Sequence, residues 1–143
     1  MNCPYCTLPE IQERKIVENE LALAFPGNMP IVPGHILIIP KRHSAKYEDL
    51  TLDERNAIED LRIKIVGSLK KTFGAQGFNF AWNDEKLAGQ SVPHFHLHIV
   101  PRKDGDSGIY EYEPRKFLYR PGERETSPEE ELINVSKLIA QNI

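Results

Sequence analysis

The chain of 143 residues carries 18 basic and 21 acidic side chains, a formal net charge of −3, and 40% of its residues are hydrophobic. This length predicts a single domain, residues 1–143, with a core of its own. The weak negative charge argues against stable nucleic-acid binding. No apolar run approaches the roughly 20 residues that a membrane span needs, and the N-terminus has no secretory signal pattern. We therefore expect a cytoplasmic protein that does not bind membranes.

The two cysteines, Cys3 and Cys6, form a C-x-x-C motif near the N-terminus. In an oxidising compartment they could close a small disulfide loop. A thioredoxin-type redox pair would follow a strand in a βαβ context, and no strand precedes this motif. In a reducing cell the pair is more typical of half a zinc site, whose other two ligands must come from elsewhere in the chain.

The first part of the chain is expected to form short strands. Residues 7–13 are polar and predict about one helical turn. Residues 15–25 predict a hairpin, with one strand ending near Val17, Asn19 in the turn and the next strand from Leu21 to Phe25.

A continuous apolar run, Ile36–Ile39, stands between a Pro-Gly turn and Pro40. It predicts a central strand that is buried on both faces. Lys41 and Arg42 follow directly, so that His43 lies where this strand leaves the sheet.

Apolar residues then recur at helical spacing over residues 52–73, which predicts one long amphipathic helix. Thr51 and Glu54 form a capping-box pattern at its start, and Gly74 is the expected C-cap. Residues 78–82 predict the next strand, and a loop over residues 83–89 follows it.

Residues 103–108 are expected to form a flexible connection, and residues 109–120 have no clean period. Ser127 as N-cap and Pro128 as first helical residue predict a last helix. The apolar stripe of this helix comprises Leu132, Val135, Ile139 and Ile143. Hairpins, a buried sheet and one covering helix indicate an α+β domain with a mainly antiparallel sheet.

Three of the five histidines, His94, His96 and His98, alternate with apolar residues in one short stretch. A period of two is that of a β-strand, whose successive side chains point to opposite faces. The pattern predicts the three histidines in a row on one face and the apolar residues in the core behind them.

Three interpretations of this row compete. The histidines could bind one catalytic metal together, divide between a structural zinc and catalysis, or form a proton-buffering or phosphate-binding row without metal. The C-x-x-C motif favours the second, because Cys₂His₂ is a standard closed zinc set. His43 and His94 are the candidates for its missing pair. His96 and His98 would then face a cavity, and a neutral imidazole is a good nucleophile towards phosphorus.

The stretch from His94 to Val100 resembles the hallmark of the histidine triad (HIT) family, His-x-His-x-His followed by apolar residues. Gln90 and Ser91 stand before it as in that family. The segment 33–40 matches the family's first long strand, and Asn83 lies at the family's distance upstream.

Further motifs indicate which members of the family the chain resembles most. The C-x-x-C motif with Lys41-Arg42-His43 resembles the zinc-carrying bacterial and archaeal members. Residues 101–103 with 109–111 resemble the fragile-histidine-triad-like dinucleoside polyphosphate hydrolases. The resemblance covers about residues 1–112, and residues 113–143 are a C-terminal extension that ends in the predicted helix.

The resemblance implies a five-stranded, mainly antiparallel sheet with helices, in a homodimer. With the long helix and the C-terminal helix predicted above, this completes the expected α+β fold. The resemblance also implies an enzyme, a hydrolase acting at the α-phosphate of dinucleoside polyphosphates or nucleoside phosphoramidates through a nucleotidyl-histidine intermediate. Adenine nucleotides are the default substrates. The alternatives are a nucleotidyl transferase or phosphorylase, and a nucleotide-binding interaction module with little turnover.

By the same resemblance, His96 would be the nucleophile, and the backbone carbonyl of His35 would hold its other ring nitrogen. His98 and Gln90 would donate to the phosphate oxygens, and Ser91 would contact the leaving group.

The remaining assignments concern the substrate and the metal. Asn83 would contact the phosphate or ribose side. Asn28 is the ribose candidate, in a loop over residues 26–30 that departs from the common family pattern. The family's positions for a structural zinc ion fall on Cys3, Cys6, His43 and His94.

Overall fold

The computed structural model describes residues 3–106 and 126–143. In this part of the chain five strands form one antiparallel sheet in the order β1-β2-β3-β5-β4. The strands are β1 (Val17–Glu18), β2 (Ala22–Pro26), β3 (Ile36–Pro40), β4 (Gly77–Ala81) and β5 (Leu97–Arg102). The expected α+β class with a five-stranded antiparallel sheet is therefore confirmed.

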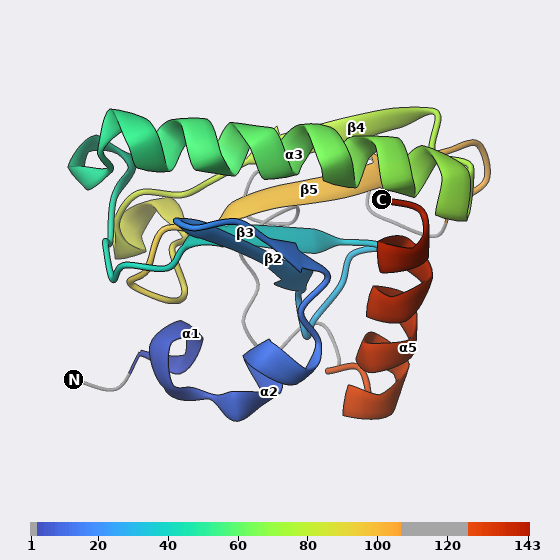
Figure 1. The fold of residues 1–143 in the computed structure, drawn as a ribbon, viewed down its shortest axis with the longest axis horizontal. Helices are drawn as coiled ribbons and strands as arrows, with labels where there is room; N and C mark the ends of the chain where they lie inside the picture. The colour runs from blue at the N-terminus through green and yellow to red at the C-terminus, as the bar shows by residue number, and fades with distance from the viewer. Residues whose placement is uncertain (1–2, 107–125) are drawn as a thin grey trace.

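Helices cover both faces of the sheet. The long helix α3 lies on one face, and the short helices α1 and α2 lie across the other (Figure 1). The C-terminal helix α5 stands at one end of the sheet and contacts α3 and β2. The helix bounds are α1 (Pro4–Thr7), α2 (Pro9–Glu13), α3 (Leu52–Phe73) and α5 (Glu129–Gln141), with 3₁₀ turns at Tyr47–Asp49 and Lys86–Ala88. None of the described helices combines the length and apolar character needed to cross a membrane.

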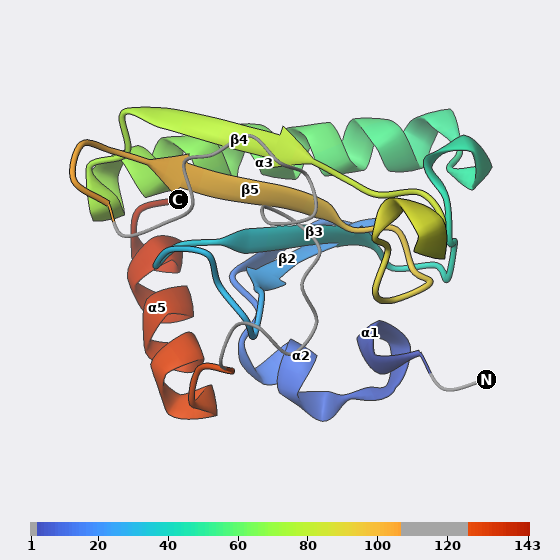
Figure 2. The ribbon, with the colours of Figure 1, turned by 180° about the vertical axis from the view of Figure 1, so that it is seen from behind.

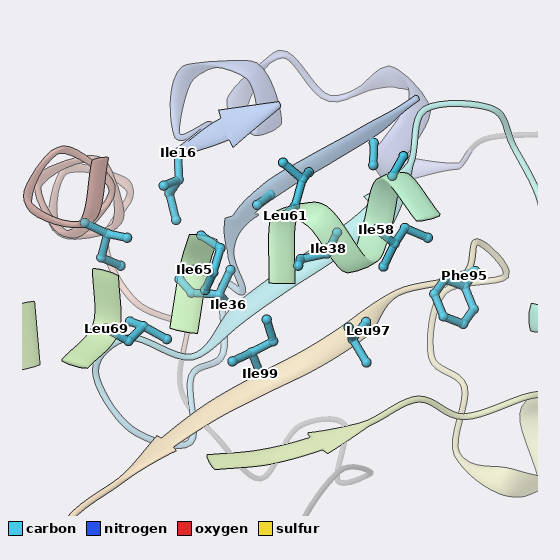
Figure 3. Packing of buried hydrophobic residues seen from close by; sticks show 14 of the residues in the cluster. Ile16, Ile36, Ile38, Ile58, Leu61, Ile65, Leu69, Phe95, Leu97 and Ile99 are labelled. Atoms are coloured by element: carbon cyan, nitrogen blue, oxygen red, sulfur yellow. The ribbon is translucent and has the colours of Figure 1, made fainter. Parts of the chain in front are cut away.

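The alternation of side chains along the strands divides the core into two parts. On the α3 face, apolar side chains of the strands pack against the helix (Figure 3). This cluster includes Ile36, Ile38, Leu97, Ile99, Leu61, Ile65 and Leu69. On the opposite face, Ile11 of α2 packs among a second cluster of strand residues, Leu23, Phe25, Leu37 and Ile39. Strand β3 is thus buried along its whole length, as the run Ile36–Ile39 predicts.

The predicted start and end of the long helix are both confirmed. The Thr51 side chain accepts a hydrogen bond from the Glu54 backbone N–H (3.1 Å), and the Glu54 carboxylate accepts one from the Thr51 N–H (2.9 Å). This reciprocal pair satisfies two of the helix's otherwise unpaired donors. Gly74 ends the helix in the left-handed region, with φ 65°.

Glu54 also pairs with Arg42, and this ion pair should make the stability of the fold depend on pH. Arg42 donates to both carboxylate oxygens (3.0 and 2.8 Å) and lowers the pKa of this buried Glu54. The carboxylate therefore stabilises the fold above its unfolded pKa of about 4.3, and this contribution is lost as the pH falls through the lower folded value. Glu54→Gln is expected to lower the melting temperature at pH 7, by a margin that shrinks towards pH 3 in scanning calorimetry.

Glu59 provides the matched control on the same helix. Arg62 also lowers its pKa, but the Glu59 side chain is half exposed. An exposed pair contributes little to stability, so Glu59→Gln should change the melting temperature much less. Equal losses in the two variants would contradict the role assigned to the buried Glu54.

Several element boundaries differ from the predictions. The second hairpin strand begins at Ala22 rather than Leu21, because the Asn19 carboxamide oxygen accepts from both of these N–H groups and extends the turn. Strand β4 lies one residue earlier than predicted. In residues 7–13 the single expected turn is replaced by α2 and the end of α1.

The start of the last helix also differs. Pro128 is its N-cap, with an extended ψ of 141°, so the helix begins at Glu129. The predicted N-cap, Ser127, instead donates its backbone N–H to the Asn28 carbonyl (2.8 Å). Ile143 lies beyond the helix and is exposed. Residues 107–125, including the stretch 109–111 of the family resemblance, lie outside the described residues.

Candidate functional site

The histidine stretch is not one continuous strand. β5 begins at Leu97, so that His98 lies in the sheet while His94 and His96 precede it. The Phe95 N–H donates to the Ser44 carbonyl (2.7 Å) rather than to a neighbouring strand. The prediction of three histidines in a row on one strand face is therefore wrong. The rings of His96 and His98 still lie side by side, with their centroids 5.0 Å apart.

The protonation of His96 is set by a backbone carbonyl. The carbonyl of His94 lies 2.8 Å from Nδ1 of His96, and because a carbonyl can only accept, Nδ1 carries the proton. Nε2 then presents a lone pair, and it has no hydrogen-bond partner among residues 3–106 and 126–143. Burial lowers the pKa of His96 and so favours the neutral ring. The hydrogen bond to the His94 carbonyl has the opposite but smaller effect on the pKa. A neutral imidazole with a free Nε2 can act as a nucleophile.

His35 acts through its side chain rather than its carbonyl. The carbonyl accepts from the Gly27 N–H (3.2 Å), and Nδ1 of His96 lies on the His94 carbonyl instead, so the prediction that the His35 carbonyl holds His96 is wrong. The Ile31 N–H donates to Nδ1 of the His35 ring (3.0 Å), which leaves the ring proton on Nε2. That Nε2–H faces Nδ1 of His98 at 3.0 Å, so the proton of a neutral His98 lies on Nε2. The sequence could not indicate this chain of donors, since it depends on the turn over residues 31–35.

Gln90 is buried, and its carboxamide holds the loop before the histidines. Its Nε2–H donates to the Ala45 carbonyl (2.7 Å), and its oxygen accepts from the Glu85 N–H (3.0 Å). These two partners engage the oxygen and one amide proton, and the second amide proton has no partner within residues 3–106 and 126–143. Ser91, the next residue, is exposed.

The two predicted asparagines lie in different surroundings. Asn83 is half-buried, and its amide lies 3.3 Å from the Gly89 carbonyl at the end of the same loop. Asn28 is exposed, and its backbone carbonyl accepts a hydrogen bond from the Ser127 N–H, just before α5. Their contacts with a substrate stay predictions.

The two cysteines and two of the histidines meet although they are far apart in sequence. One ligand atom from each of Cys3, Cys6, His43 and His94 lies within 4.8 Å of all the others. Nδ1 of His94 is 3.4 Å from both sulfurs, and Nδ1 of His43 is 3.5 Å from the Cys6 sulfur. Sulfur and nitrogen ligands of one tetrahedral zinc ion are about 3.6 Å apart.

The tautomer of His94 suits a metal as well. Its Nε2 lies 2.8 Å from the Pro40 carbonyl and therefore carries the proton, so that Nδ1 turns a lone pair towards the thiols. Such an outer hydrogen bond typically orients histidine ligands. The side chains of Cys3, Cys6, His43 and His94 thus form a group that could bind a metal, and we call this group the metal clip.

Comparison with known proteins agrees with this architecture. The HIT domain family model matches residues 8–105. A bis(5'-adenosyl)-triphosphatase of Dictyostelium discoideum is 35% identical over 109 residues, which are 76% of this chain and 70% of that protein. An adenosine 5'-monophosphoramidase of Schizosaccharomyces pombe is 35% identical over 111 residues, 76% and 80% of the two chains. The chain therefore belongs to the HIT family.

Solved structures give the same family. A hypothetical histidine triad nucleotide-binding protein from Sulfolobus tokodaii is 25% identical, with a TM-score of 0.77 over 98% of this chain and 91% of that one. A zinc-bound histidine triad family protein from Mycobacterium smegmatis is 30% identical, with a TM-score of 0.65 over 89% and 84% of the two chains.

Proposed function

We propose that the protein is a nucleotide hydrolase that acts at the α-phosphate of dinucleoside polyphosphates or nucleoside phosphoramidates, with adenine nucleotides as default substrates. The observation that carries the proposal is the protonation pattern of two adjacent rings. His96 offers an unprotonated Nε2, and the neighbouring His98 carries its proton on Nε2. The pair thus presents a nucleophile beside a hydrogen-bond donor. The names of the relatives, a triphosphatase and a phosphoramidase, support the same chemistry.

In the proposed reaction, Nε2 of His96 attacks the α-phosphorus. A P–N bond forms as the bond to the leaving phosphate or amine breaks, which gives a nucleotidyl-histidine; a leaving amine takes up a proton from solvent, and the attacking water of the next step returns one. Water then attacks the phosphorus, the P–N bond breaks, and the nucleoside monophosphate leaves with the water oxygen. His98 and the second amide proton of Gln90 donate to the phosphate oxygens as charge develops. Ser91 contacts the leaving group.

Binding of the nucleoside is assigned to the two asparagines. Asn83 would contact the phosphate or ribose side, and Asn28 the ribose hydroxyls. Both are side chains that can donate and accept hydrogen bonds, as the hydroxyls of a ribose require.

We also propose that the metal clip binds a structural zinc ion. Two thiolates and two neutral imidazoles are the donor set that zinc prefers, and a closed four-ligand site leaves no position for substrate. A bound ion would tie α1 to the ends of β3 and the histidine loop. Both thiols are free, and a reducing compartment such as the cytoplasm would keep them so.

The nucleotidyl-histidine provides the direct test. Wild-type protein mixed briefly with diadenosine polyphosphates and with an adenosine phosphoramidate, then quenched, should show an adenylyl adduct by intact-mass spectrometry and peptide mapping to His96. Turnover without an adduct on His96, at every quench time, would refute the proposed route. Formation of a nucleoside diphosphate on addition of phosphate would indicate a phosphorylase, and tight binding without turnover a binding module.

We further propose a homodimer formed through β4. β4 is the outermost strand beside β5 (Figure 2), and Phe80 and Trp82 at this edge are 43% and 41% exposed. Together with the exposed Leu52 they line a cavity of about 520 Å³. An exposed apolar edge strand readily pairs with another chain.

A charged edge should prevent this pairing. Phe80→Glu with Trp82→Glu is expected to give the mass of one chain in size-exclusion chromatography with light scattering, where the wild type gives two. Leu138→Glu, which changes an exposed apolar residue on α5, should leave the mass unchanged. A wild type that runs as a single chain at micromolar concentration would refute the proposed dimer.

A further inference from the structure

Tyr5 lies between the two cysteines, on α1, and its ring meets two histidines with different proposed roles. The ring centroid is 5.8 Å from that of His94 and 5.3 Å from that of His96, both edge-on. Phe25 of β2 lies against the same ring at 5.5 Å. Tyr5 thus packs against a residue of the metal clip and against the proposed nucleophile at once.

The His96 ring needs such a neighbour. In the part of the chain that the structure describes, the ring makes one hydrogen bond, from Nδ1 to the His94 carbonyl; this fixes one ring atom, and the ring can still rotate about that contact. A nucleophile must be held within about 0.5 Å and 10–20° of its reactive geometry. Among the described residues, two rings contact His96 edge-on, His98 at an interplanar angle of 64° and Tyr5 at 80°. The Tyr5 contact limits the swing that the hydrogen bond permits.

Tyr5 in turn depends on the cysteines around it. α1 has four residues, no side-chain cap at its N-terminus and no fully buried residue. A helix of this length does not form by its own propensity. Cys3 and Cys6 bracket Tyr5 and reach His94, and Cys6 also reaches His43. A metal ion bound to these four side chains would therefore fix both ends of the segment that carries Tyr5.

We propose that Tyr5 is a positioning residue for His96 and that metal binding at the metal clip holds Tyr5 in place. The proposal rests on the hydrolase function proposed above. The aromatic ring is the part that acts, because the hydroxyl makes no hydrogen bond to a described residue. Phenylalanine should therefore replace tyrosine, and leucine should not.

Kinetics of two variants test the positioning. Tyr5→Leu is expected to lower kcat about three- to tenfold with little change in KM, since it removes one aromatic contact that aligns the reacting atom. Tyr5→Phe should keep kcat within about twofold of wild type. Bound metal, measured by elemental analysis, should be the same in all three proteins. Ile11→Ala, in the same apolar cluster, is the control for lost packing and should lower the melting temperature while keeping kcat.

Three outcomes would overturn the proposal. The first is a wild-type kcat in Tyr5→Leu, and the second is an equal loss in Tyr5→Phe. The third is a change confined to KM, which would mean that Tyr5 binds substrate instead of aligning His96.

Nuclear Overhauser effects test the dependence on metal without any substrate. Contacts between the rings of Tyr5 and His96 should appear in the metal-loaded protein and vanish on chelation, at a temperature where the sheet stays folded. The stacked pair Tyr47 and Trp82, with centroids 4.7 Å apart, is the internal control and should keep its contacts. Contacts of Tyr5 that persist without metal would refute the dependence. A wild type without turnover would refute the hydrolase function, while this measurement still decides whether metal holds Tyr5 against His96.

Discussion

His96→Ala is expected to lower kcat by about 10⁴-fold or more, as the loss of a covalent nucleophile does in other enzymes. His98 cannot take over the role. Its Nδ1 accepts a hydrogen bond from the His35 ring N–H and its Nε2 is protonated, so neither nitrogen of the neutral ring presents a lone pair to phosphorus. Single-turnover kinetics on the best substrate, with mass detection of the adduct, would measure the loss.

A variant of the neighbouring ring gives the matched comparison. His98→Ala removes a donor to the phosphate but leaves the nucleophile, so we expect a smaller loss of about 10²- to 10³-fold, with the adduct still formed slowly. Binding of adenosine monophosphate by calorimetry should weaken less than about tenfold in His96→Ala, because that ring contributes its reacting atom and little ground-state affinity. Wild-type turnover in His96→Ala would show that another residue attacks the phosphorus.

The local patterns in the sequence were sufficient to predict the helices and strands whose side chains are buried in a regular pattern. Ile36–Ile39 and the helix over residues 52–73 are confirmed, since the continuous apolar run reflects burial on both faces of the sheet and the 3.6-residue period reflects contact of one helix face with the core. The capping box of Thr51 and Glu54 is confirmed because its two hydrogen bonds join residues three apart.

Features set by distant backbone groups could not be predicted in the same way. The alternation in residues 94–98 is that of a strand, yet the Phe95 N–H pairs with Ser44, some 50 residues away, and the ladder starts later. The hydrogen bonds of His35 and Gln90 likewise end on backbone groups whose positions the fold decides. The metal clip is the exception, because ligand chemistry alone links Cys3 and Cys6 to histidines far along the chain.

Removal of metal from the clip is expected to lower the free energy of unfolding by about 4 kcal/mol, if free zinc had been about 1,000-fold above its dissociation constant. For a chain of this size the loss corresponds to a melting temperature about 10 °C lower. The physical reason is that α1 is short and has no fully buried residue of its own, so metal–ligand bonds to Cys3 and Cys6 would tie it to the sheet. Thermal denaturation with and without a chelator, alongside elemental analysis, would measure the effect.

A variant with Cys3→Ser and Cys6→Ser supplies the control, because it should melt at the lower temperature whether or not a chelator is present. The same measurement separates the proposed structural zinc from a catalytic metal held by three histidines. A catalytic ion would be needed for turnover but not for folding, so chelation would abolish activity at an unchanged melting temperature. The rings favour the structural ion. Nδ1 of His94 faces the thiols and its Nε2 carries the proton towards the Pro40 carbonyl, so this ring has no further lone pair for a metal shared with His96 and with His98, whose Nδ1 faces His35. The three histidines therefore face different partners, and stability should fall with the metal.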